Sequence, residues 1–62
     1  MFVKLHNRNG DLVWINMSII KCMTWNENKN VSQLLVFNDP NGFHFEVRET
    51  PETIVELMKK MR

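Results

Sequence analysis

The chain has 62 residues, 44% of them hydrophobic, with a formal net charge of +1. This length predicts a single domain over 1–62 and leaves no room for a catalytic cleft between domains, while the apolar content argues against wholesale disorder. The near-neutral charge argues against recognition of nucleic acid or anionic membrane by bulk charge, and no apolar run approaches the roughly 20 residues of a membrane span. We therefore expect a cytoplasmic protein without membrane insertion.

The first two predicted strands form a hairpin. Apolar and polar side chains alternate over 1–6, and an Asn-Gly dipeptide typical of a tight turn follows. A second strand is predicted over 12–16, where apolar side chains occupy both faces. We expect the face of Leu12 and Trp14 to meet a partner rather than water.

Two further strands are predicted in the middle of the chain. The stretch 19–25 is rich in β-branched and aromatic residues, which favour strands. The spacing of three from Ile20 to Met23 breaks strict alternation, so we expect a bulge or a short helical turn over 17–20. After a polar turn, 31–37 is a nearly continuous apolar run and is predicted to be the central strand.

The last part of the chain is predicted to be a hairpin strand followed by a helix. A turn over 38–42 leads into a strand in which Phe43, Phe45 and Val47 share the core face. Thr50 is predicted to cap the closing helix. The apolar stripe of that helix comprises Ile54, Leu57, Met58 and Met61. The predicted fold class is α+β, a small curled antiparallel sheet of about five strands with one C-terminal helix.

Residues capable of chemistry are few and scattered. His6, His44 and Cys22 lack the close paired spacing of zinc modules, and no nucleophile or acid–base motif is recognisable. We therefore predict no enzyme activity, no catalytic residue, no metal and no cofactor. Cys22 is expected to be a buried apolar filler and His44 a solvated strand residue. Carboxylates such as Glu46 and Glu49 are interpreted as solubilising surface groups.

Two kinds of binding surface remain open. Tryptophan in a small domain often anchors a protein interface, and an edge strand or an apolar sheet face also allows self-association. The predicted protein interface comprises Leu12, Trp14 and Trp25. The alternative is a small nucleic-acid-binding sheet, in which aromatic side chains stack on bases and basic residues hold phosphates. The predicted contacts for that alternative are Arg8, Lys59 and Lys60.

Turn and core residues recur in a recognisable order along nearly the whole chain. They are Leu5, Asn9 and Gly10, then Ile15 and Asn16, then Ile19 and Ile20, and finally Val47, Glu49 and Thr50. This order resembles the FlbD family, also called the swarming motility protein SwrD, although Arg8 stands where that family usually has leucine. The resemblance implies a non-enzymatic accessory protein of bacterial flagellar motility, and similar small proteins also look common in phages. We expect a protein-interaction or accessory module whose partner is another protein or a second copy of itself.

Overall fold

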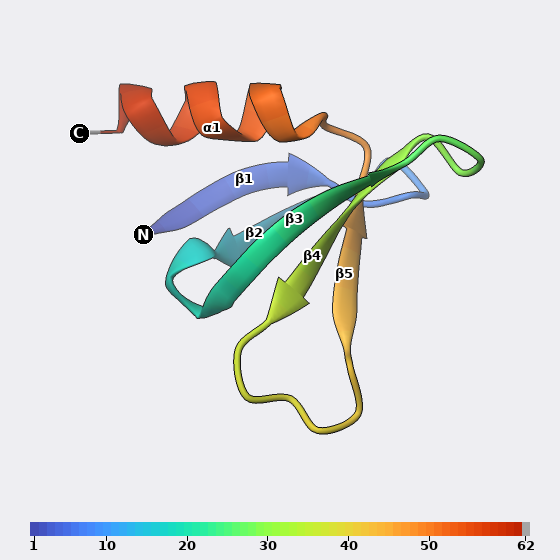
Figure 1. Ribbon diagram of the computed structural model, residues 1–62. Coiled ribbons are helices and arrows are strands. Elements are labelled where there is room, and N and C mark those ends of the chain that lie inside the picture. The colour runs from blue at the N-terminus through green and yellow to red at the C-terminus, as the bar shows by residue number, and fades with distance from the viewer. Residues whose placement is uncertain (62) are drawn as a thin grey trace.

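The chain folds into two antiparallel sheets and one C-terminal helix (Figure 1). The computed structural model describes residues 1–61. The elements are β1 (Phe2–His6), β2 (Leu12–Asn16), the 3-10 helix η1 (Met17–Ile19), β3 (Ile20–Asn26), β4 (Val31–Val36), β5 (His44–Val47) and α1 (Pro51–Lys60). The predicted α+β class is confirmed, and the strands divide into a β1–β2 sheet and a β3–β4–β5 sheet. The predicted central strand, β4, is the middle strand of the larger sheet.

The loop between β1 and β2 is a β-turn, in which the Gly10 amide donates to the Asn7 carbonyl at 3.0 Å, and the Asn7 side chain reinforces it. The Asn7 Oδ1 atom accepts hydrogen bonds from the backbone amides of Asn9 and Asp11, at 2.9 and 3.0 Å. Gly10 has a φ of 89°, a conformation that glycine adopts without a steric penalty. The Asn-Gly pair therefore lies in a turn, as predicted, but only its glycine needs a positive φ.

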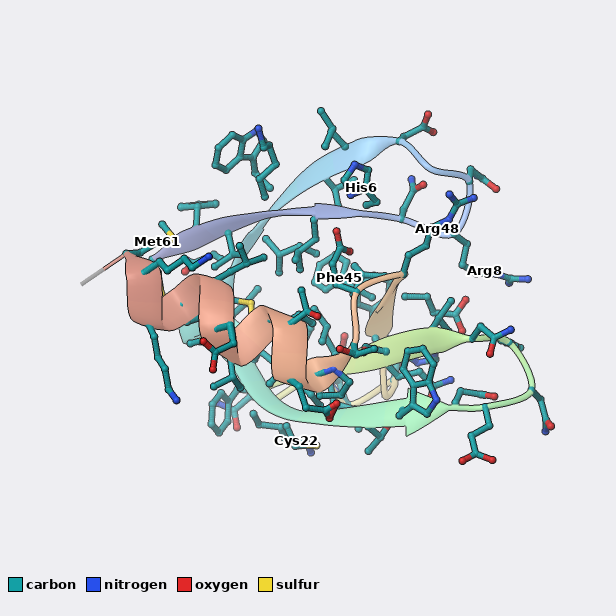
Figure 2. All side chains as sticks on the ribbon, turned by 90° about the horizontal axis from the view of Figure 1, so that it is seen from above. His6, Arg8, Cys22, Phe45, Arg48 and Met61 are labelled. Carbon is teal, nitrogen blue, oxygen red and sulfur yellow. The ribbon has the colours of Figure 1, made fainter. Side chains whose placement is uncertain are left out.

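The junction between the sheets has the irregularity that the apolar spacing predicted. The η1 helix begins after Asn16, whose side chain accepts a hydrogen bond from the Ser18 amide, and a register shift lies between Ile20 and Cys22. Cys22 consequently lies on the outer face of β3 and is exposed (Figure 2). The prediction of a buried thiol is wrong because the bulge changes which residues of this strand face the core.

The core lies between the two sheets and under the helix. Its buried apolar side chains are Val3, Leu5, Ile15, Met17, Leu34, Val47 and Ile54. The sheets meet at one end, where Asn7 and Val47 form an isolated bridge and the Arg48 amide donates to the His6 carbonyl at 2.8 Å. Apart from this junction between the end of β1 and the end of β5, the two sheets share no strand pairing among the described residues.

The helix α1 begins where it was predicted and packs against β1 and β3 (Figure 1). The Thr50 Oγ1 atom accepts a hydrogen bond from the Thr53 amide at 3.2 Å, and Ile54 is the fully buried residue of the helix. Two predicted core residues are exposed: Phe43, which precedes β5, and Met61, at the helix C-cap. Both follow the correct periodicity but lie beyond the ends of the elements that carry it. No helix of the described chain is long and apolar enough to cross a membrane.

Candidate binding groove between β2 and β5

A groove with a volume of about 620 Å³ separates β2 from β5. Its apolar walls are Val13, Trp14, Ile15, Phe43, Phe45 and Val47, and its polar walls are Asn7, Arg8, Asn9, Lys29, His44 and Glu46. The rings of Phe43 and Phe45 meet edge to face with centroids 4.9 Å apart. This volume lies within the range of ligand sites in proteins, roughly 300 to 1,000 Å³.

The β2 side of the groove presents backbone groups that have no partner strand. Among the described residues, β2 pairs only with β1. Backbone groups of successive residues in an antiparallel strand point to opposite sides. The Met17 amide donates to the Met1 carbonyl at 2.8 Å, on the β1 side. By alternation, Leu12 and Trp14 turn their N–H and C=O groups away from β1, and Trp14 is one of the residues that line the groove.

The β5 side of the groove also has backbone groups without a partner strand. The Arg48 amide donates toward β1 and not toward β4. By the same alternation, the backbone groups of His44 and Glu46 point away from β4. The two walls of the groove therefore belong to strands that each have one unpaired edge, whose N–H and C=O groups are available to an extended chain.

Glu46 is the most connected charged residue of the groove. Arg8 Nη1 donates to its Oε1 atom at 3.3 Å, while Lys29 Nζ and His44 Nε2 lie 3.6 and 3.4 Å from its Oε2 atom. Desolvation raises the pKa of Glu46, but hydrogen bonds from Gln33 and His44 and the charges of Lys29 and Arg8 lower it below its ordinary value. Its side chain is only 17% exposed, so Glu46 is a paired carboxylate and not the simple solubilising group predicted.

A second, basic pocket of about 410 Å³ adjoins the closed end of the groove. It is lined by Arg8, Lys29, Asn30, Val31 and Arg48, and so shares Arg8 and Lys29 with the groove. The Arg48 Nε and Nη2 atoms donate to the Arg8 carbonyl at 3.2 and 3.0 Å, which holds the guanidinium in place. Of the described residues that line this pocket, none is acidic. The sequence does place His44, Glu46 and Arg48 on the outer face of their strand. It does not indicate which residues of other elements lie beside them in the groove and the basic pocket.

The three predicted interface residues do not form one surface. Leu12 and Trp14 lie on the outer face of the β1–β2 hairpin and are 57% and 63% exposed, and Trp14 also reaches the groove. Lys4, opposite Trp14 in the register, places its Nζ 5.8 Å from the indole centroid. Trp25 belongs to β3, in the other sheet, and does not line the groove.

The basic residues predicted to contact nucleic acid are also separated. Arg8 lies in the loop after β1, whereas Lys59 and Lys60 end α1 near the opposite end of the molecule (Figure 2). Lys59 pairs with Glu56 on the same helix at 3.7 Å. Of these three basic residues, only Arg8 lines the groove, where Trp14 also lies.

Glu49 has a structural role outside the groove. Its Oε1 atom accepts the His6 amide at 2.9 Å and its Oε2 atom lies 2.7 Å from His6 Nδ1. Burial raises the pKa of Glu49, but hydrogen bonds from the amide and ring of His6 lower it below the ordinary value. Glu49 therefore ties β1 to the segment before α1 and was wrongly interpreted as a solvated surface acid. Within residues 1–61, no group of three His, Cys, Asp or Glu side chains is placed to hold a metal ion.

The fold and the groove define a small α+β protein whose two sheets have open edges on either side of an aromatic groove. No protein-family model, no curated protein and no solved structure matches this chain.

Proposed function

We propose that this protein is a non-catalytic interaction module that binds a segment of a partner protein in the groove between β2 and β5. The single observation that carries the proposal is the aromatic groove, whose two walls belong to strands that each have one unpaired edge. An extended peptide adds to such an edge through main-chain hydrogen bonds, and neighbouring pockets select its side chains.

The side chains of the groove support a peptide ligand. Phe43 and Phe45 offer a preformed aromatic wall beside Val13, so burial of apolar side chains would supply binding energy. Aromatic residues at interfaces lose little conformational freedom when a partner covers them. The exposed Leu12 and Trp14 extend this apolar surface onto the hairpin. A second copy of the chain could use the same open edges, which makes self-association the competing form of this proposal.

An accessory role in flagellar motility, in the cytoplasm, is proposed from the FlbD resemblance alone. The residues that carry this resemblance have structural roles in the fold. Leu5, Ile15 and Val47 are buried, Gly10 has a positive φ, and Thr50 caps α1. The resemblance therefore supports a common fold more strongly than it supports a common partner.

Hydrogen exchange tests the peptide-binding proposal. The purified chain is used to select binders from a library of displayed random peptides, and amide exchange is measured with and without a selected peptide. The amides of Trp14 and Glu46, on the open edges, should exchange quickly alone and slowly in the complex. The amides of Ile15 and Phe45, which point to β1 and β4, serve as matched controls and should be protected in both states. Failure to select a peptide, or protection that leaves the open edges unchanged, contradicts the proposal.

Nucleic-acid binding is the second candidate, favoured by one observation. Trp14 and Arg8 line the same groove, which combines a stacking surface with a cation. The groove walls oppose it, because Arg8 and Lys29 are their only Arg and Lys residues and Glu46 pairs with both, which leaves little free positive charge for a run of phosphates. Anisotropy of a labelled single-stranded oligonucleotide at 50 and 200 mM salt, concentrations in the range where phosphate contacts weaken markedly, tests this candidate. Salt-sensitive binding that is lost in Trp14→Ala would support it.

A further inference from the structure

We propose that the groove recognises the free C-terminal end of an extended peptide, with the terminal carboxylate in the basic pocket formed by Arg8, Lys29 and Arg48. This inference rests on the proposed function and specifies which part of a partner chain is bound. Its basis is the juxtaposition of an apolar groove, closed at one end, with three cations at the closed end.

The closure of the groove restricts how a peptide fits. At one end the bridge between Asn7 and Val47 joins the two sheets, and the hydrogen bond from the Arg48 amide to the His6 carbonyl reinforces it. At the bridge the backbones of the two sheets are hydrogen-bonded to each other, so no strand can be added between them there. A peptide strand lying between β2 and β5 must therefore turn away or end at the bridge, and a chain terminus satisfies this constraint without a turn.

The charges at the closed end determine which terminus is bound. Arg8 and Lys29 line both the groove and the basic pocket, and Arg48 completes the pocket. Glu46 pairs with both Arg8 and Lys29 but carries only one negative charge, so the three cations leave the closed end with an excess of positive charge. A terminal ammonium would be repelled there, whereas a carboxylate gains charge-assisted hydrogen bonds from the guanidinium and ammonium groups.

The same polarity is compatible with strand pairing to β5. A peptide whose C-terminus lies at the bridge runs parallel to β5, which ends at Val47 beside the bridge, and can pair with the backbone groups of its open edge. Its alternate side chains would then face the apolar wall of Phe45 and Val13. The favoured ligand is a C-terminal segment with apolar residues at alternate positions and a free terminal carboxylate.

The test compares three forms of one peptide. A peptide is selected from a random library displayed with free C-termini, then synthesised as the free acid, as the C-terminal amide, and as the acid extended by a short Gly-Ser tail. Affinities are measured by fluorescence anisotropy. Because hydrogen bonds to charged groups are worth more than neutral ones, amidation should weaken binding by about tenfold or more. The extension should weaken binding similarly, since it moves the carboxylate away from the pocket.

A charge-matched pair of variants locates the effect. The double variant Arg8→Ala/Lys29→Ala should reduce affinity for the free acid by about tenfold or more and bind acid and amide equally. The control Lys59→Ala/Lys60→Ala removes the same charge from the far end of α1 and should bind as the parent does. Protection of the Ile15 and Phe45 amides establishes that each variant is folded.

The possible outcomes separate the two proposals. Selected peptides that protect the Trp14 and Glu46 amides but bind equally as acid, amide and extended forms overturn C-terminal recognition and leave peptide binding intact. A library without binders overturns both. Binding of an oligonucleotide that displaces the peptide, with higher affinity at low salt, assigns the cations to phosphates and overturns the carboxylate assignment.

Discussion

Truncation of Ile54 should separate the contribution of helix docking from that of helix formation. Ile54 is fully buried where α1 packs over the sheets, whereas its neighbour Val55 is 38% exposed. Ile54→Ala removes buried methyl and methylene groups and leaves a cavity, so we expect a loss of about 3 kcal/mol in the free energy of unfolding. Domains of this length have a total stability of about 3 to 9 kcal/mol, which makes the loss a large fraction of the whole.

The matched control is Val55→Ala. Both substitutions replace a β-branched residue by alanine at adjacent positions of α1, so the gain in helix propensity is similar and largely cancels in the comparison. The exposed position should change stability by no more than about 0.5 kcal/mol. The difference between the two variants therefore measures burial of the helix against β1 and β3.

Urea unfolding followed by far-UV circular dichroism measures both variants. The midpoint for Ile54→Ala should fall with an unchanged slope, and its melting temperature should fall by about 10 to 25 °C. If Ile54→Ala and Val55→Ala differ by less than about 1 kcal/mol, then α1 is not anchored by Ile54 and the assigned core is wrong.

Three further predictions concern single side chains. Gly10→Ala and Gly42→Ala both place a Cβ at positive φ, which should destabilise each variant by about 1 kcal/mol or more. Only at Gly10 would the new Cβ meet another group, Arg48 Nη1 at 3.2 Å. Thermal melts should therefore show the larger loss of stability for Gly10→Ala. Because the pKa of Glu49 is lowered in the fold, its stabilising effect should be present above its unfolded pKa, near 4.5, and decline as the pH falls through the lower folded value. Between neutral pH and pH 3, the free energy of unfolding of Glu49→Gln, measured by urea titration, should therefore fall less than that of the parent protein. Cys22 should react with a thiol reagent in the native protein nearly as fast as in denaturant, whereas a strongly protected thiol would contradict its exposed position.

The sequence predicted most of the local structure because local structure depends on short-range patterns. Alternation identified β1 and β2, the spacing of three after Ile20 identified the irregular start of β3, and the Thr-Pro-Glu sequence identified the start of α1. These signals depend on backbone geometry within a few residues, so they remain visible without knowledge of the fold. The errors lie at element ends and at the bulge, as Phe43, Met61 and Cys22 illustrate.

The tertiary structure alone decided where the strand edges and charges meet. Nothing local to β2 or β5 indicates that five strands divide into two sheets or that β2 and β5 flank a common groove. Arg8 and Glu46, which form an ion pair, lie 38 positions apart in the chain. Such a pairing depends on how the chain packs and not on a local sequence pattern. The sequence by itself determined the elements and their apolar faces, because these follow from periodicity. The groove with its basic closed end exists only because the sheets join at one end and remain apart elsewhere.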